Sequence, residues 1–204
     1  MRQPEAKTMA SHPKNLLTPE DYLAFDRQCE YKNEYFAGEV FAMTGASREH
    51  NLIVTNTIRT LGNQLLTRDC NVYPSDLRVK IQPIEKYTYP DVVMTCGEEQ
   101  FEDEYRDTLL NPVVIIEVLS ASTEAYDRGK KFARYQQIDS LVEYILIAQD
   151  HYRIERYVRQ PDRTWVYSEF RALDDVVQLT SIGCHLALQD VYAKLNLRLS
   201  KEDQ

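Results

Sequence analysis

Long hydrophobic segments are absent from this sequence. Its aliphatic runs are short, as in Val113 to Ile116, whereas a membrane-spanning helix needs about 20 apolar residues. With 6 glycines and 8 prolines among 204 residues, the chain also lacks the composition of collagen-like or low-complexity proteins. Hydrophobic residues make up 43% of the chain. We therefore expect a globular protein with its own core and no membrane partner.

Basic residues are outnumbered by acidic ones. The 24 lysines and arginines stand against 32 aspartates and glutamates, which gives a formal net charge of -8. A protein that coats nucleic acid obtains its affinity from cationic side chains on phosphates. The charge balance therefore excludes a simple basic coat protein.

Cysteine is scarce, and the four cysteines form no C-x-x-C pair that would indicate a metal or redox site: Cys29, Cys70, Cys96 and Cys184. The first 15 residues contain no apolar segment of the kind found in secretory signals. We therefore predict a reduced, cytoplasmic protein whose cysteines are free thiols, each packed as a small apolar side chain.

Two helices are indicated in the first third of the chain. Thr18 can cap a helix that begins Pro19-Glu20-Asp21 and directs Tyr22, Leu23 and Phe25 inward. Ser47 can cap a second helix, whose apolar face follows spacings of four, three and four: Val54, Ile58, Leu61 and Leu65. Residues 31–43, between these helices, are typical of a helix end or a hairpin around Gly38.

The rest of the chain alternates between strand and helix patterns. Apolar and polar residues alternate over 77–82, and the later apolar segments 91–95, 113–119 and 143–148 predict buried strands. A helix is expected over 123–138, a hairpin over 152–159 and 164–170, and a short closing helix over 186–197. The pattern predicts a mixed α/β fold with a buried sheet centre and an antiparallel flank. Residues 1–16 are expected to be a flexible arm and 17–204 a single domain.

Two carboxylates interrupt apolar strands. Glu117 lies inside Val113 to Leu119, and Asp91 follows Pro90 at the start of another strand. An unpaired charge in a buried strand costs several kcal/mol, so a cation, a proton or a metal ion must compensate it. If the strands are neighbours, the two carboxylates could bind Mg²⁺ or Mn²⁺. The alternatives are a strand cap for Asp91 and an ion pair of Glu117 with Arg128 or Lys131.

A basic segment follows Glu117 on the next predicted helix. Lys131 and Tyr135 are four residues apart and therefore share one helical face. A lysine beside a metal-bound water can orient that water and stabilise developing negative charge. The alternative is a solvated basic face, which we favour for Lys130 and not for Lys131.

These segments, taken in order, resemble the Uma family of restriction-endonuclease-like proteins in the PD-(D/E)XK nuclease superfamily. The resemblance spans about residues 18 to 195 and is carried by Pro90-Asp91, Glu117-Val118-Leu119-Ser120, Tyr126 to Tyr135 and Glu143-Tyr144, with Glu34 to Val40 and Ser47 to Asn51 upstream. It implies a restriction-endonuclease-like mixed sheet flanked by helices, a divalent metal and phosphodiester hydrolysis. Asp91 and Glu117 would then be metal ligands, with the Val118 carbonyl as a third.

The resemblance also assigns roles to other residues. Glu34 would be an acid on an N-terminal helix, and His50 matches a recurring histidine that either lines the site or caps a helix. The superfamily pattern would place a lysine at 119, where this chain has Leu119. The family is expected to supply the lysine from the next helix, which points to Lys131, with Tyr135 beside it. We expect replacement of Lys131 by alanine to reduce cleavage and leave the fold nearly intact.

Two functions are consistent with these residues. The first is a Mg²⁺-dependent DNA endonuclease that acts as a homodimer, with an interface in the aromatic hairpin 152–170. A basic stripe would bind its DNA: Arg48, Arg59, Arg78, Lys80, Arg128, Lys130 and Arg134. The second is a catalytically inactive protein of the same fold that binds metal or DNA as an accessory module, motivated by Leu119 and the net negative charge.

Overall fold

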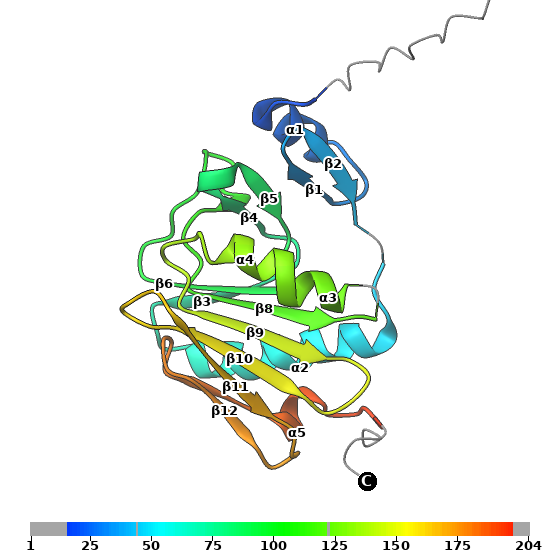
Figure 1. The fold of residues 1–204 in the computed structure, drawn as a ribbon, viewed down its shortest axis with the longest axis vertical. Coiled ribbons are helices and arrows are strands. Elements are labelled where there is room, and N and C mark those ends of the chain that lie inside the picture. Colours follow the sequence, from blue (N-terminus) through cyan, green and yellow to red (C-terminus); the bar gives the residue numbers. More distant parts are fainter. Residues whose placement is uncertain (1–15, 44, 122, 198–204) are drawn as a thin grey trace, which may run out of the picture.

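The structure is a computed structural model that describes residues 16–43, 45–121 and 123–197. In this part of the chain, no helix is long and apolar enough to cross a membrane. The predicted arm falls almost entirely on residues outside the described ranges. The fold mixes helices with three β-sheets, as the sequence predicted (Figure 1).

A six-stranded sheet forms the centre of the molecule (Figure 1). Its strand order is β11 (Trp165–Phe170), β10 (Ile154–Arg159), β9 (Glu143–Ala148), β8 (Val114–Leu119), β6 (Val92–Cys96) and β3 (Cys70–Pro74). The two middle strands, β8 and β9, pair in parallel and are buried along their whole length. The other pairs are antiparallel. The apolar runs of the sequence thus become central strands, because both faces of the sheet are covered.

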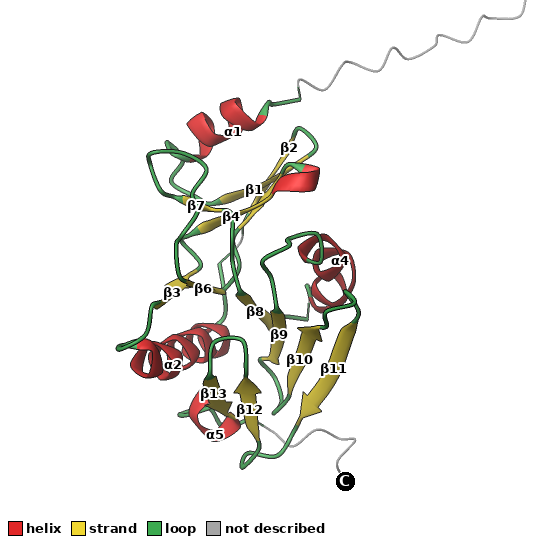
Figure 2. Cartoon of the chain, turned by 90° about the vertical axis from the view of Figure 1, so that its left-hand side faces the viewer, coloured by secondary structure: helices red, strands yellow, loops and turns green. Residues whose placement is uncertain are grey.

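Each face of this sheet has its own cover (Figures 1 and 2). Helix α2 (Arg48–Leu65) packs on one face, together with α5 (Leu188–Val191) and the two-stranded sheet of β12 (Val176–Leu179) and β13 (Cys184–Ala187). The other face is covered by α3 (Glu124–Tyr126), the π-helical turn η2 (Asp127–Lys131) and α4 (Phe132–Tyr135). The Ser47 hydroxyl accepts a hydrogen bond from the His50 backbone N–H at 3.0 Å, which confirms the predicted cap of α2.

A second sheet stands beside the central one (Figure 2). Its strand order is β2 (Glu39–Ala42), β1 (Asn33–Phe36), β5 (Lys86–Thr88), β4 (Arg78–Ile81) and β7 (Thr108–Leu109), and the 3₁₀ turn η1 (Gln82–Ile84) follows β4. Helix α1 (Pro19–Asp26) packs on this sheet through Tyr22, whose ring lies 5.0 Å from that of Tyr35 and 5.2 Å from that of Tyr87. Strands β1 and β2 pair antiparallel on either side of Gly38. This segment is thus a hairpin, the second of the two predicted alternatives.

A buried arginine ties α1 to the second sheet. The Arg78 guanidinium donates to Asp26 at 2.9 Å, to the Tyr89 hydroxyl at 3.0 Å and to the Thr108 hydroxyl at 2.7 Å. Burial of these charges is tolerated because each is paired and hydrogen-bonded. The network fixes the N-terminal segment that delivers Glu34 to the cavity described below.

Several local predictions need correction. The helix expected over 123–138 is interrupted by the π-helical turn η2, and the closing helix over 186–197 is reduced to α5 because residues 184–187 form β13. Phe25, expected to face inward, is 45% exposed. In each case the local pattern predicted an ordered segment, but contacts with other parts of the chain decided its secondary structure or which side chains it buries.

The prediction of four free thiols is wrong. Cys70 and Cys96 form a disulfide, while Cys29 and Cys184 are free. The two bonded cysteines are direct partners in the antiparallel register of β3 and β6. Strand pairing brings their side chains together across the 26 positions that separate them, a proximity that the spacing in the sequence could not reveal.

Candidate functional site

A cavity of about 840 Å³ opens between the β1–β2 hairpin, the start of α2, the C-terminal end of β8 and the turn η2. Five of the six side chains proposed from the sequence line it: Glu34, His50, Asp91, Glu117 and Lys131. Tyr135 is fully buried behind the cavity wall. Residues far apart in the sequence therefore meet here, because ends of strands from both sheets and the ends of two helical segments converge around the cavity.

Asp91 lies directly before β6, next to the end of β8. Its Oδ2 accepts a hydrogen bond from the Val118 backbone N–H at 2.7 Å, and its Oδ1 lies 3.1 Å from His50 Nε2. Pro90 begins the segment because it has no N–H to give to a ladder. Asp91 thus caps the neighbouring strand, as the alternative interpretation proposed, while its carboxylate faces the cavity.

Glu117 is the buried carboxylate of the site, with 3% of the residue exposed. The Lys131 Nζ and the Tyr135 hydroxyl both contact Glu117 Oε1, each at 2.8 Å. Burial raises the pKa of the Glu117 carboxyl to about 8, and the Lys131 ammonium opposes this rise. The ion pair with Lys131 was one of the predicted alternatives, and it places the lysine directly beside the proposed ligand.

Lys131 is surrounded by carboxylates. Besides Glu117, its Nζ lies 3.5 Å from Asp127 Oδ1, one helical turn earlier. Burial alone would lower the pKa of Lys131, but Glu117, Asp127 and Glu34 outweigh it and hold that pKa well above the usual range. The lysine therefore carries its positive charge into the cavity from η2, and π-helical turns are frequent at functional sites.

Glu34 reaches the cavity from strand β1 and not from a helix, which corrects the role implied by the resemblance. It accepts hydrogen bonds from Lys86 Nζ at 2.8 Å and from the Thr88 hydroxyl. Burial would raise the pKa of Glu34, but the ammonium groups of Lys131 and Lys86 outweigh it and lower that pKa below its usual value. Glu34 is thus an ionised acid held on the second sheet.

Sequence reasoning missed three polar residues of this network. Asp127 could have been found, since it lies four positions before Lys131 and shares its helical face. Lys86 is almost fully buried on β5, and Thr88 links Glu34 to Tyr135, with the two hydroxyls 3.4 Å apart. Nothing local distinguishes Lys86 or Thr88 from exposed strand residues, because their burial depends on how the second sheet packs.

The donor set fits a hard divalent cation of the Mg²⁺ type. Mg²⁺ usually keeps several waters and takes one or two protein carboxylates, which Asp91 and Glu117 can supply from one cavity. In residues 16–43, 45–121 and 123–197, no three His, Cys, Asp or Glu side chains form a metal-binding group by themselves. A site here therefore needs water or a backbone oxygen as well.

The Val118 carbonyl is well placed to be that oxygen. The N–H and C=O of a strand residue point to the same flank, and the Val118 N–H points to Asp91. Continuing the register in which Val92 pairs with Ile116 places Pro90 opposite Val118. Because proline has no N–H, Pro90 gives this carbonyl no ladder hydrogen bond.

Three members of the predicted basic stripe are paired with carboxylates. Arg78 is buried against Asp26, Lys80 pairs with Glu102 at 2.5 Å, and Arg128 is bonded to Glu124 and Glu155. These cations are compensated inside the protein. Arg59 and Lys130 are exposed, so these three residues alone are removed from the stripe.

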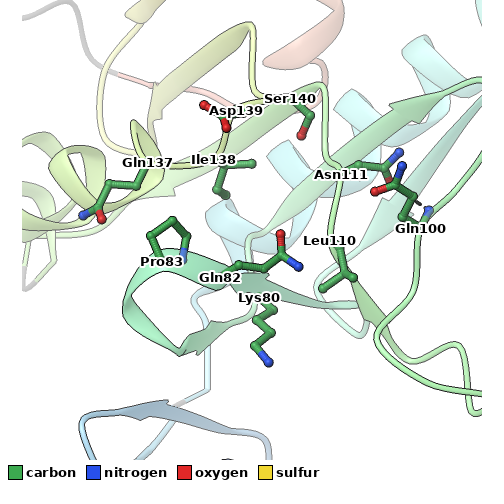
Figure 3. A pocket seen from close by; sticks show the side chains of 10 residues that line it. All are labelled: Lys80, Gln82, Pro83, Gln100, Leu110, Asn111, Gln137, Ile138, Asp139 and Ser140. Atoms are coloured by element: carbon green, nitrogen blue, oxygen red, sulfur yellow. Dashed lines mark hydrogen bonds between the residues drawn. The ribbon is translucent and has the colours of Figure 1, made fainter.

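A smaller cavity of about 190 Å³ lies at the N-terminal ends of β8 and β9 (Figure 3). Its lining is rich in amides: Lys80, Gln82, Pro83, Gln100, Leu110, Asn111, Gln137, Ile138, Asp139 and Ser140. Asn111 Oδ1 accepts from the Gln100 N–H at 2.9 Å and the Ser140 hydroxyl donates to the Pro112 carbonyl at 2.8 Å. Its polar groups thus hold the loops before the central strands together.

Comparison with known proteins places these features in a family. The family model Uma2, described as "Putative restriction endonuclease", matches residues 19–189. Two proteins of Synechocystis are similar to this chain. One, "Uncharacterized protein slr1290", is 35% identical over 185 residues, covering 91% of this chain and 96% of that protein. The other, "Uncharacterized protein sll1609", is 38% identical over 154 residues, covering 76% of this chain and 87% of that protein.

A solved structure shares the fold. It is a crystal structure from Anabaena variabilis described as "a putative nuclease belonging to DUF820". The TM-score is 0.72 and the sequence identity 18%, over 87% of this chain and 98% of that one. At this identity the likeness shows the fold alone.

Proposed function

The chain belongs to the Uma2 family of restriction-endonuclease-like proteins, and from this premise we propose that it is a metal-dependent endonuclease that hydrolyses phosphodiester bonds in DNA. The observation that carries the proposal is the meeting of Asp91, Glu117 and Lys131 in one cavity. Two carboxylates and a lysine in one cavity are the groups that metal-assisted hydrolysis requires.

Asp91, Glu117 and the Val118 carbonyl would hold a Mg²⁺ or Mn²⁺ ion. When bound, such an ion supplies positive charge that polarises a phosphoryl oxygen. Asp91 keeps its orientation because the Val118 N–H and His50 hold one oxygen each. The proposed ligands are thus held in place before any substrate binds.

Lys131 would orient the attacking water and stabilise negative charge at the phosphorus. Its ammonium can donate three hydrogen bonds, and Glu117 at 2.8 Å uses one of them. Lys131 would therefore take the place of the lysine that Leu119 excludes from β8. Glu34 and Asp127 keep Lys131 protonated, so it acts as a donor and not as a base.

The proposal is tested with pure protein on two substrates, plasmid DNA and single-stranded DNA. We expect cleavage that requires Mg²⁺ or Mn²⁺ and is lost in Asp91→Asn and Glu117→Gln. The exposed residues Asp174 and Glu104 provide matched controls, since Asp174→Asn and Glu104→Gln make the same chemical changes away from the cavity. Calorimetric titration with Mn²⁺ should show binding to the wild type and to both controls, and weak or no binding to Asp91→Asn.

The two sequence-based functions give different results in these assays. An accessory protein without turnover would bind Mn²⁺ or DNA and leave both DNA substrates intact under every condition. Cleavage that persists in Asp91→Asn or Glu117→Gln would show that the chemistry happens elsewhere. Circular dichroism of each variant separates loss of function from loss of fold.

We also propose that the protein is a homodimer that pairs through β11. This strand is an edge of the central sheet, where Val166 and Tyr167 are 50% and 49% exposed. Most of the other hairpin aromatics pack within the protein itself, as Trp165 and Tyr157 do against Phe132 of α4. Light scattering should give twice the monomer mass at micromolar concentration, and Val166→Lys should give a monomer. A monomeric wild type would rule the dimer out.

A further inference from the structure

We infer that the cavity accepts a single unpaired strand of DNA and that Tyr31 stacks on one of its bases at the cavity mouth. The inference rests on the proposed function in taking DNA as the ligand. It goes further by naming the structural class of that DNA. Four observations carry it: the depth of the site, the charges of its lining, a bridge across its wall and the exposure of Tyr31.

The reactive groups lie at the bottom of the cavity. Glu117 is 3% exposed and Lys131 is 8% exposed, so a phosphate must enter between the two sheets to reach them. The cavity volume of about 840 Å³ falls within the range of small-ligand pockets, about 300 to 1,000 Å³. A stiff duplex cannot bend into such a space without a large deformation energy, whereas a few unpaired nucleotides can.

The charges around the cavity are unfavourable for a duplex. Duplex binding depends on many Lys and Arg contacts to phosphates. Among the described lining residues the lysines are Lys32 and Lys131, and both are paired with carboxylates. Glu30 is an exposed acid that also lines the cavity. Such a rim repels two closely spaced phosphate backbones more strongly than one.

One wall of the cavity is a bridge between the two sheets. Lys32, just before β1, extends to the loop between β3 and β4, where its Nζ lies 2.7 Å from Asp76 Oδ1 and 3.2 Å from the Ser75 carbonyl oxygen. The contact occupies one side of the cavity that contains Asp91, where a single strand needs less room than a duplex.

Tyr31 supplies the recognition element. It lines the cavity and is 72% exposed, which places its ring at the mouth. The Tyr31 backbone is fixed, since its carbonyl accepts from Asn33 Nδ2 at 2.8 Å. Single-stranded nucleic acids bind largely by stacking their bases on aromatic side chains, a contact that a duplex with paired bases cannot offer.

The inference is tested by binding, separately from cleavage. A labelled single strand of about 12 nucleotides, the matching duplex and an RNA strand of the same sequence are titrated with the full-length protein, with fluorescence anisotropy as the readout. Ca²⁺ replaces Mg²⁺, and the titrations are repeated in EDTA. The variants are Tyr31→Ala and Tyr31→Phe. Tyr105→Ala is the matched control, because Tyr105 is 67% exposed and contacts Arg27 outside the cavity.

We expect the single DNA strand to bind at least ten times more tightly than the duplex. Tyr31→Ala should weaken this binding about tenfold, which corresponds to about 1.4 kcal/mol, while Tyr31→Phe and Tyr105→Ala should not. Equal or tighter duplex binding, no binding of the single strand, a preference for RNA, or equal effects of Tyr31→Ala and Tyr105→Ala would overturn the inference.

Its failure can be told apart from failure of the proposed function. If the single strand binds through Tyr31 but no DNA is cleaved in Mg²⁺ or Mn²⁺, the inference stands and the endonuclease proposal fails. If an intact duplex is cleaved as readily as a single strand, the endonuclease proposal stands and the inference fails.

Discussion

Replacing Lys131 by methionine should destabilise the protein strongly at neutral pH and much less at acidic pH. Methionine keeps a straight side chain of similar length but removes the charge. Lys131 faces Glu117 at 2.8 Å and Asp127 at 3.5 Å, and all three residues are buried. Burial already raises the pKa of Glu117 to about 8, so the carboxylate that loses its compensating charge at neutral pH is that of Asp127. This prediction differs from the sequence-based expectation that Lys131 can be replaced at little cost to the fold.

The size of the effect follows from the proton that a buried carboxyl must take up in the absence of Lys131. Each pH unit above the pKa of an unfolded carboxyl, near 4, costs about 1.4 kcal/mol. Carrying that proton therefore costs about 4 kcal/mol at pH 7 and about 1 kcal/mol at pH 5. The first value agrees with the roughly 3 to 5 kcal/mol measured when one partner of a buried ion pair is removed.

Urea denaturation at pH 5 and pH 7 measures both values. Lys130→Met is the matched control, because Lys130 is the exposed neighbour of Lys131 and its substitution should change the free energy of unfolding by less than about 0.5 kcal/mol. Equal losses for the two substitutions would refute the reasoning. A loss for Lys131→Met that does not change with pH would refute the proton argument in particular.

Two further predictions concern the scaffold. The Arg27 guanidinium, which hydrogen-bonds Asp107 at 2.8 Å, and the nearby Arg78 hold the pKa of the Asp107 carboxyl below its usual value. Asp107 therefore stabilises the fold above the unfolded pKa near 4, and this stability is lost as the pH falls through the lower folded pKa. In Asp107→Asn, the free energy of unfolding measured in urea should fall less steeply with decreasing pH below pH 4 than in the wild type. An unchanged dependence on pH would contradict this. Thiol titration of the denatured, unreduced protein should find two free cysteines, and Cys70→Ser should lower the free energy of unfolding by about 3 kcal/mol. Four reactive thiols would show that the disulfide is not formed.

The amino-acid sequence by itself determined the parts of this protein that depend on short-range patterns. The apolar runs that become β8 and β9 predicted central strands, because only strands covered on both faces are apolar along their whole length. Ser47 before an amphipathic segment predicted the start of α2. The same reasoning singled out Glu117 as a charge that an apolar strand cannot leave uncompensated.

The ordered motifs, together with the family resemblance, predicted which residues gather at the candidate site. They could not predict from which elements these residues come. Glu34 was assigned to a helix and lies on β1, because a carboxylate beside aromatic residues fits either element locally. Lys86 escaped notice for a related reason, since a lysine in an alternating strand is usually exposed.

Only the tertiary structure decided how the two sheets face each other, and that arrangement made the cavity. Packing of the second sheet buried Lys86 and brought Glu34 to Lys131, and pairing of β3 with β6 joined Cys70 to Cys96. It also paired Arg78 with Asp26 and Arg128 with Glu155, two arginines that the sequence suggested were free for DNA. The physical reason is that hydrophobic periodicity and helix capping depend on residues a few positions apart. Burial and ion pairing depend instead on long-range contacts that form when separate elements pack.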